Sequence, residues 1–316
     1  MRIWQAQGSN VALLCIGVAA ALGGSETLWA PRPNRHAAPT TGAPAHCTPV
    51  RDATGQRIMP ARYRRVVSTS PVADSVLWAL LEPARLTAVS RYSADEHPAR
   101  HRYAGKANVA SLARSEALFA LRPDLVVVQH YGRPRRLAQL RTLGLRIFDL
   151  GPVHDLDDLD AAIDRLGKLL QVKGRARRYR NQLRARAQRL GRLQQRRRPR
   201  RALYLARYGG ALMSAGRGSS YNSILRLAGL NNALGAQAGH PRLGAERILA
   251  LRPAVLITKA GMATDICARP ALRQLWACQH AAQFVLELPP FLLDSNGPEM
   301  LDAAEQIEAW WALRRR

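Results

Sequence analysis

Aromatic and cationic side chains follow the strands expected in this chain, at their carboxyl ends. The residues concerned are Arg91, His130, Tyr131, Arg207, Tyr208 and Lys259. In open α/β sheets, ligands bind outside the carboxyl ends of the strands. Tyrosine rings stack on flat groups, and cations form charge-assisted hydrogen bonds with negative ones. The set therefore predicts a binding site for a flat or bulky ligand that carries negative charge.

An internal repeat predicts the elements that position these residues. Segments 115–128 and 245–258 each carry a glutamate and then an Ala-Leu-Arg-Pro sequence whose proline stands seven residues after that glutamate. An apolar run follows in both. A run that is apolar on both faces is typical of a buried parallel strand. Each copy is therefore expected to be a helix–strand unit of an α/β sheet. The duplication predicts two similar lobes.

A basic helical spine, residues 155–199, joins the two copies of the repeat. Its first part, 155–170, has apolar residues at a helical period, and its second part, 175–198, is rich in arginine. A slack point is expected between them, and Pro199 ends the second part. At a rise of 1.5 Å per residue, the second part would span about 36 Å, which suits a rigid strut between lobes. Such a strut predicts only a small opening on ligand release.

The other expected elements include a small hairpin, an irregular loop and a closing helix. Turn residues at 52–55 predict the hairpin within 48–60, and residues 289–295 are expected to form the loop. Residues 299–313 have the apolar spacing of a helix with one buried face.

The amino terminus predicts export. Residues 1–30 contain an arginine, a short apolar run and small residues, as in a secretory signal peptide, and 31–47 form a linker expected to be disordered. The remaining expected domains are an N-terminal lobe at 48–154 and a C-terminal lobe at 200–316. The net charge of +26 favours anionic partners, although codon bias toward arginine is an equal explanation.

Export permits disulfides, and three cysteines remain after the signal peptide. Cys267 and Cys278 flank a short helical segment and are the expected pair, which leaves Cys47 alone. No spacing of cysteine and histidine indicates a metal site.

Several of these motifs together resemble the periplasmic iron-siderophore and cobalamin binding proteins, which are solute receptors of ABC importers. They are Asp52-x-Thr54-Gly55, the sequence from Arg65 to Pro71, and both copies of the repeat. The resemblance covers about residues 48–313. It implies two Rossmann-like lobes with parallel sheets, joined by a long rigid helix, with the ligand held between them. It also implies a monomeric periplasmic protein, without a cofactor or catalysis, that works with a permease–ATPase complex at the inner membrane.

The resemblance also assigns roles to residues. Tyr92 stands where the cobalamin-binding relative has a tyrosine that contacts the ligand. A second contact segment corresponds in place, though not in letters, to Phe291, Leu292, Leu293, Asp294 and Ser295. Glu116 and Glu246 match glutamates that dock onto permease arginines, although a glutamate at this position also complements a helix dipole.

The expected ligand is a ferric siderophore or a corrinoid, and the alternatives stay open. A heme or metal-ion receptor of the same superfamily is one, with heme less favoured because segment 107–110 lacks the tyrosine often found there. A basic nucleic-acid-binding protein is another, but the arginines of 175–201 surround an apolar stripe, as on a solvated helix face. Paired carboxylates and nucleophile motifs that would indicate an enzyme do not stand out.

Overall fold

The computed structural model describes residues 48–109, 115–129, 134–194 and 199–313. The expected signal peptide and linker lie outside these residues. The described residues belong to one compact unit. None of the helices within these ranges is both long and apolar enough to cross a membrane.

The N-terminal lobe is built on a five-stranded parallel sheet in the order β5-β4-β3-β6-β7. Its strands are β3 (Val66–Ser68), β4 (Leu86–Ser90), β5 (Ala107–Val109), β6 (Leu125–Val128) and β7 (Ile147–Asp149). Every residue of β3, β6 and β7 is buried, and all except Ser68 and Asp149 are apolar, as expected for strands covered on both faces.

Helices connect these strands. They are α1 (Pro71–Leu80), α2 (Arg91–Asp95), α3 (Ser115–Ala120) and α4 (Pro134–Thr142), with 3-10 turns at Pro83–Arg85 and Arg100–Tyr103. Ser70 begins α1, because its side chain accepts a hydrogen bond from the Ala73 amide and Pro71 suits the first helical position. The short helix α2 follows β4 directly and was not expected from the sequence.

The expected hairpin is present as β1 (Val50–Arg51) and β2 (Arg57–Ile58). Asp52 forms its turn, since one carboxylate oxygen accepts from the amides of Thr54 at 2.8 Å and Gln56 at 2.9 Å. Its other oxygen accepts from Arg141 on α4. The Asp-x-Thr-Gly motif is therefore a structural turn that attaches the hairpin to the lobe.

The C-terminal lobe contains a second parallel sheet, in the order β11-β8-β12-β13. Its strands are β8 (Arg201–Tyr204), β11 (Asn231–Asn232), β12 (Val255–Lys259) and β13 (Val285–Leu288), and β9 (Ala206–Tyr208) pairs antiparallel with β10 (Ala211–Met213). Its helices are α7 (Ser220–Leu227), α8 (Ala245–Leu251), α9 (Ala263–Cys267), α10 (Trp276–Gln279), α11 (Ala281–Phe284) and α12 (Pro290–Asp294), with a 3-10 turn at Leu272–Gln274.

The repeat is structural as well as sequential. Its copies form α3–β6 in one lobe and α8–β12 in the other. Each helix ends at an arginine with left-handed backbone, Arg122 at φ 44° and Arg252 at φ 45°, and a proline follows each. The shared Arg-Pro sequence thus ends both helices in the same way.

The connection between the lobes differs from the expected spine. Helices α5 (Leu156–Leu169) and α6 (Lys173–Gln194) lie side by side, and the chain reverses between them at Gln171, whose φ is 57°. Gly167 permits the close approach, because a side chain there would meet Ala176. The expected slack point is therefore a sharp turn, and α6 alone leads to the second lobe, over about 33 Å.

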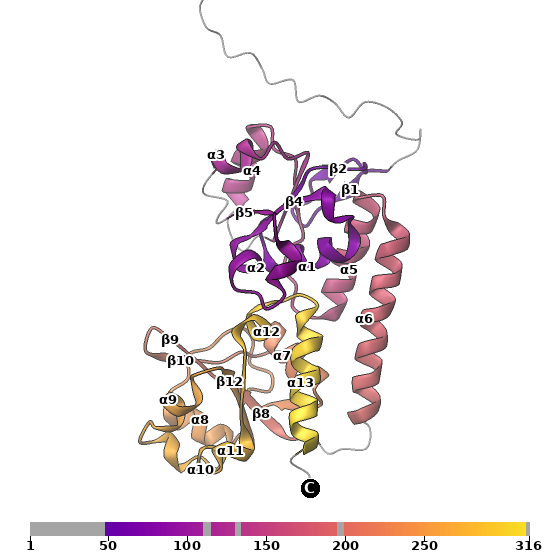
Figure 1. The fold of residues 1–316 in the computed structure, drawn as a ribbon. Helices are drawn as coiled ribbons and strands as arrows, with labels where there is room; N and C mark the ends of the chain where they lie inside the picture. Colours follow the sequence, from indigo (N-terminus) through magenta and orange to yellow (C-terminus); the bar gives the residue numbers. More distant parts are fainter. Residues whose placement is uncertain (1–47, 110–114, 130–133, 195–198, 314–316) are drawn as a thin grey trace, which may run out of the picture. The chain divides into compact units, whose positions relative to one another are not determined.

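The closing helix α13 (Glu299–Leu313) runs beside α6 (Figure 1). Arg186 of α6 donates to Asp302 and Glu305 of α13. One hydrophobic core cluster contains residues of both lobes, among them Leu77, Leu183, Ile257 and Ile307. The lobes are therefore joined by packed helices as well as by the crossing chain.

Candidate functional site

Lys259 is the buried cation at the carboxyl end of β12. Its side chain is 8% exposed, and its ammonium donates to Asp294 at 2.7 Å and to the Tyr208 hydroxyl at 2.5 Å. The ammonium also lies 4.7 Å from the centre of the Tyr208 ring. Burial by itself lowers the pKa of Lys259, but the bonds to Asp294 and Tyr208 outweigh it and raise that pKa. The lysine therefore stays charged.

Two further tyrosines complete this arrangement. The rings of Tyr204 and Tyr221 stack with centroids 4.1 Å apart, and the Tyr221 hydroxyl donates to Asp294 at 2.7 Å. Burial raises the pKa of both phenols, so both remain neutral. We call Tyr204, Tyr208, Tyr221, Lys259 and Asp294 the tyrosine–lysine cluster.

Local structure explains how the cluster is assembled. Tyr204 ends β8, and Tyr208 ends β9 at a turn made by Gly209 and Gly210, both at positive φ. Tyr208 is 48% exposed, which leaves much of its ring open to a ligand. Tyr221 lies in the first turn of α7, which Ser219 caps through the Asn222 amide.

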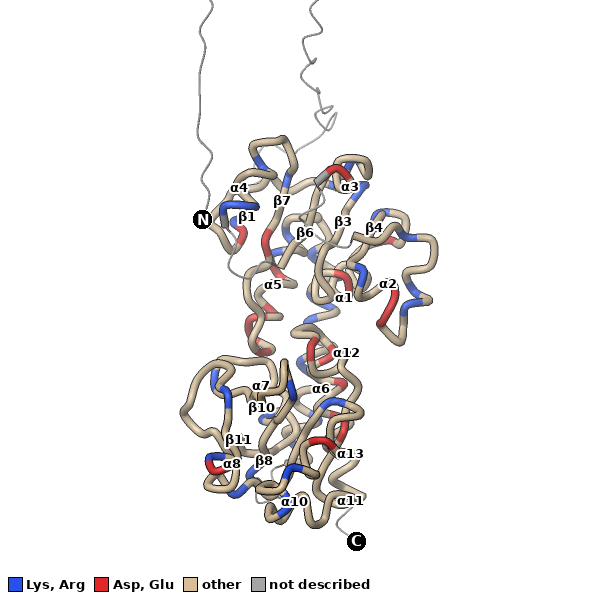
Figure 2. Tube along the Cα trace, turned by 90° about the vertical axis from the view of Figure 1, so that its left-hand side faces the viewer, with Lys and Arg blue, Asp and Glu red and all other residues tan. Residues whose placement is uncertain are grey.

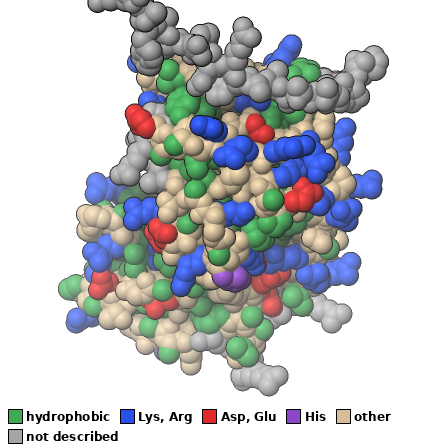
Figure 3. Space-filling view, turned by 45° about the horizontal axis from the view of Figure 1, so that its top comes forward, with side chains coloured by type: hydrophobic (Ala, Val, Ile, Leu, Met, Phe, Trp, Pro, Cys, Tyr) green, Lys and Arg blue, Asp and Glu red, His purple; other side chains and the backbone are tan. Residues whose placement is uncertain are grey.

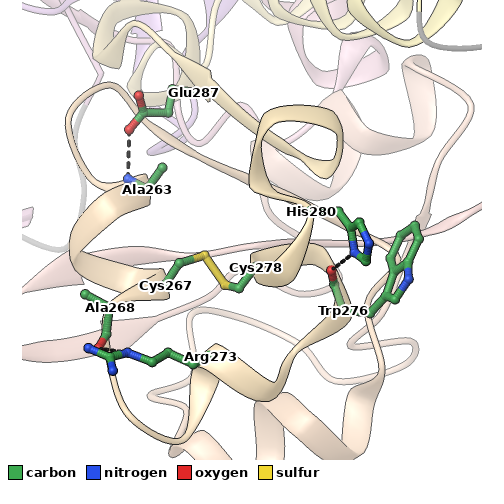
Figure 4. Close-up of a disulfide and its surroundings, with 8 residues drawn as sticks. All are labelled: Ala263, Cys267, Ala268, Arg273, Trp276, Cys278, His280 and Glu287. Carbon is green, nitrogen blue, oxygen red and sulfur yellow. Dashed lines mark hydrogen bonds between the residues drawn. A yellow bond between two sulfur atoms is a disulfide. The ribbon is translucent and has the colours of Figure 1, made fainter.

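Arg207, the neighbour of Tyr208, is exposed and pairs with Asp265 of α9 at 3.1 Å. A disulfide between Cys267 and Cys278, the expected pair, links α9 to α10 (Figure 4). Glu287 accepts from the Ala263 amide at the start of α9. The disulfide thus supports the helix that carries the partner of Arg207.

Tyr92 is the corresponding aromatic residue of the N-terminal lobe. It is half-buried in the first turn of α2. Burial raises the pKa of its phenol first, and the charges of Asp294, Glu96 and Glu299 raise it further. His97 connects Tyr92 to the helix that carries Asp294. The His97 amide donates to the Tyr92 carbonyl at 3.1 Å, and the His97 ring meets the Phe291 ring of α12 at 5.5 Å.

A buried carboxylate, Asp74, holds α2 in place. It accepts from the Ser90 amide at 3.1 and 3.2 Å and from the Ser90 hydroxyl. Ser90 in turn caps α2 through the Ser93 amide. Burial raises the pKa of Asp74 from 3.8 to about 6, although hydrogen bonds from Ser68, Ser90 and Ser93 oppose this shift.

The segment expected as an irregular loop at 289–295 is largely a helix, α12. Leu292 and Leu293 are buried in the core, and buried Ser295 donates to Glu299 at 2.6 Å. Asp294 faces the tyrosine–lysine cluster, and the half-buried Phe291 meets the His97 ring edge-on at 5.5 Å. Because one turn of helix points residues in several directions, its five residues cannot all face one ligand.

The remaining expected ligand residues are dispersed. Arg91 is exposed and pairs with Asp95 at 3.3 Å. His130 and Tyr131 lie outside the described residues. Tyr204, Tyr221, His97 and Glu299 were not expected, although Tyr204 and Tyr221 carried the signal of an aromatic residue at a strand end or a helix start.

The two glutamates of the repeat are exposed. Glu116 lies in the first turn of α3 and Glu246 in the first turn of α8. They occupy the same place in the two repeat units, one in each lobe.

Two cavities among the described residues lie away from these tyrosines. One of about 880 Å³ lies where β1 meets the turn between α5 and α6, and its lining includes Arg51, Arg165 and Lys168. An adjoining one of about 370 Å³ is lined by residues of α5 and α6. Neither contains an aromatic side chain, and neither lies at the carboxyl ends of the strands, so we place the candidate site at the tyrosines.

On the face drawn in Figure 3, the described residues do not form a basic surface that stands out as a nucleic-acid site. Lys and Arg occur along both lobes in Figure 2, and on the face drawn in Figure 3 they are interspersed with acidic and apolar side chains. Over the part of the chain that the structure describes, no three His, Cys, Asp or Glu side chains form a group that could hold a metal ion.

Comparison with known proteins decides the family. The model of the family "Periplasmic binding protein" matches residues 66–287, more than half of the chain. The chain belongs to the periplasmic binding protein family. A search of curated proteins finds no match for this periplasmic binding protein.

Solved structures agree with that fold. The periplasmic vitamin B12 binding protein BtuF of Vibrio cholerae has a TM-score of 0.67 at 23% identity, over 81% of this chain and 100% of its own. The periplasmic heme-binding protein RhuT of Roseiflexus sp. RS-1 has a TM-score of 0.70 at 22% identity, over 80% of this chain and 99% of its own. A periplasmic heme binding protein of Pseudomonas aeruginosa has a TM-score of 0.62 at 26% identity, over 79% of this chain and 92% of its own. The expected fold class, two α/β lobes with parallel sheets and a long helix, is confirmed.

Proposed function

We propose that this periplasmic binding protein is the solute receptor of an ABC importer and that it binds a large metal chelate between Tyr92 and the tyrosine–lysine cluster. The chelate classes that fit are corrinoids, heme and ferric siderophores. The observation that supports this best is the buried Lys259, which presents a held positive charge beside the exposed Tyr208 ring.

The cluster suits a ligand with a flat face and a negative edge. The Tyr208 ring offers a stacking surface, and the half-buried Tyr92 offers a second one from the other lobe. Lys259 supplies charge-assisted hydrogen bonds to a carboxylate or phosphate. Hydroxyls of neutral tyrosines add donors at the rim of such a ligand.

A tetrapyrrole is the better supported of these chelates. Corrinoids and heme are flat, and relatives named as vitamin B12 and heme binding proteins share the fold. Heme, less favoured from the sequence, is therefore restored to equal standing with a corrinoid. The residues proposed to contact the ligand are Tyr92, Arg207, Tyr208, Lys259, Phe291 and Asp294. Leu292, Leu293 and Ser295 are buried, so they are not included among the proposed contacts.

Delivery requires a contact with the permease. The exposed Glu116 and Glu246 support a docking surface, because each lobe offers one carboxylate in the same position of its repeat unit. Arginine side chains of a permease would form charge-assisted hydrogen bonds with them. The proposed site of this exchange is the periplasmic face of the inner membrane, after export of the chain.

Titration of the purified protein with heme, cyanocobalamin and a ferric siderophore tests the proposal. Quenching of tryptophan fluorescence and calorimetry would report affinity, and we expect one class to bind with a dissociation constant of about 1 µM or less. Tyr208→Ala should weaken that binding, while Trp276→Phe, remote from the cluster, should preserve it. Absence of binding by all three classes, or equal affinity of Tyr208→Ala and the unmodified protein, would refute the proposed ligand site.

A further inference from the structure

A buried carboxylate links the two lobes next to the proposed ligand site. Glu299, at the start of α13, is 5% exposed. It accepts hydrogen bonds from Ser75 of α1 at 2.5 Å and from Ser295 at 2.6 Å. Burial alone would raise the pKa of Glu299, but the nearby His97 ring and the hydrogen bonds from Ser295 and Ser75 lower it, so the carboxylate is ionised.

His97 faces this carboxylate from the N-terminal lobe. The Ala99 amide donates to Nδ1 of His97 at 3.0 Å, so in the neutral ring the proton lies on Nε2. That nitrogen lies 3.8 Å from Glu299 and is itself buried. The Phe291 ring of α12 covers the same imidazole edge-on.

His97 and Glu299 are each connected to a residue that we propose contacts the ligand. The His97 amide donates to the Tyr92 carbonyl at 3.1 Å, so the two residues belong to one hydrogen-bonded turn. On the other side, Ser295 follows Asp294 at the end of α12. Any movement of Glu299 relative to Ser75 and His97 would therefore change the separation of Tyr92 and Asp294.

The same stretch of α1 acts on both lobes. Asp74 fixes Ser90, the cap of α2, and the next residue, Ser75, binds Glu299. Helix α1 is thus fastened to the turn that carries Tyr92 and to the start of α13 by adjacent side chains. The Asp74–Ser90 bonds are buried and the Ser75–Glu299 bond is partly buried, so loss of one partner leaves the other poorly replaced by water.

We propose that Glu299 is a positioning residue of the ligand site, holding Tyr92 of one lobe at a fixed distance from Asp294 of the other through Ser75 and His97. This inference rests on the function proposed above for the role of Tyr92 and Asp294. It goes beyond that function because Glu299 touches no ligand in it and acts only through its partners.

Glu299→Ala removes both acceptor oxygens and tests the inference in two ways. Affinity for the tightest of the three probe chelates should fall about tenfold, as expected for loss of a buried hydrogen-bond partner. Hydrogen exchange of the amides in 91–99, measured without ligand, should become about tenfold faster. Glu299→Gln, which keeps one acceptor oxygen and the shape, should recover part of both losses.

Two further variants complete the test. Ser75→Ala leaves Glu299 in place but removes its partner on α1, so it should reproduce the faster exchange even if Glu299→Ala does not fold. Glu305→Ala removes a carboxylate from the same helix that pairs with Arg186, and it should alter neither readout. Unchanged exchange in 91–99 in both the Glu299 and Ser75 variants would overturn the inference. If the unmodified protein binds none of the chelates, the proposed function fails, and the exchange measurement still decides whether Glu299 holds this turn.

Discussion

Lys259 at the end of β12 donates its ammonium to the Asp294 carboxylate of α12 at 2.7 Å. The lysine side chain is 8% exposed and the aspartate side chain 35%. The carboxylate thus orients a cation that is otherwise desolvated. A negative group of a ligand would meet a lysine whose direction is already fixed, which lowers the entropic cost of binding it.

Replacement of Lys259 by methionine should therefore weaken binding according to the charge of the ligand. We expect about a tenfold loss for heme, whose propionates are negative, and a smaller loss for cyanocobalamin, which has no net charge. Calorimetric titration measures both. Lys168→Met provides the control, because Lys168 is 53% exposed and pairs with Asp164 outside the site. Equal losses of affinity for the two ligands would show that Lys259 does not distinguish ligands by their charge.

Asp74 should make stability depend on pH. Its pKa rises from 3.8 to about 6 on folding, so the folded state holds a proton that the unfolded state has released between these values. The contribution of Asp74 to the free energy of unfolding is therefore fully present below about pH 4 and is lost as the pH rises through about 6. The difference between the folded and unfolded pKa values of Asp74 corresponds to about 3 kcal/mol of stability.

Urea unfolding of the unmodified protein and of Asp74→Asn across this range tests the point. The free energy of unfolding of the unmodified protein should fall relative to that of Asp74→Asn as the pH rises from about 4 to above 6. Asp157→Asn, at an exposed acidic residue, serves as the control. A constant difference between the unmodified protein and Asp74→Asn would contradict the raised pKa.

Asp52→Ala should destabilise the N-terminal lobe. The substitution leaves the amides of Thr54 and Gln56 without their acceptor and removes the carboxylate that binds Arg141. The expected cost is about 3 kcal/mol, since Asp52 itself is buried and its hydrogen bonds are partly buried. Thermal unfolding followed by circular dichroism measures it, and a shift of the midpoint within error of zero would contradict the role of the turn.

Reversal of both exposed glutamates should separate delivery from binding. With Glu116→Arg and Glu246→Arg together, we expect uptake by cells to be abolished while the affinity of the purified protein for its ligand is unchanged. Like charges would then face the permease arginines. Uptake at the normal rate, or loss of ligand affinity in the double variant, would count against the docking proposal.

Sequence reasoning predicted the elements that depend on local patterns. The repeat, the hairpin at Asp52, most strands and the helix from Glu299 to Leu313 follow from apolar runs, turn residues and helical spacing. It did not predict that the chain reverses at Gln171, because a non-glycine residue with positive φ gives no signal in the letters. The expected spine was therefore one helix too long.

The site was only partly predictable. Lys259 ends β12, and Tyr208 follows the end of the neighbouring parallel strand β8 by four residues, so their proximity followed from the topology of that sheet. The helix α12 was not predicted because a helix this short cannot be told from a loop by periodicity. The contact of Glu299 with Ser75 joins residues 224 positions apart, and nothing in one sequence relates them.

A structure of the protein with its tightest-binding chelate tests the central proposal most directly. The proposal predicts a ligand in contact with both Tyr92 and Tyr208, with a negative group within hydrogen-bonding distance of Lys259 Nζ. A ligand bound instead in the cavity beside Arg51 and Arg165, or one that touches neither tyrosine, would contradict it.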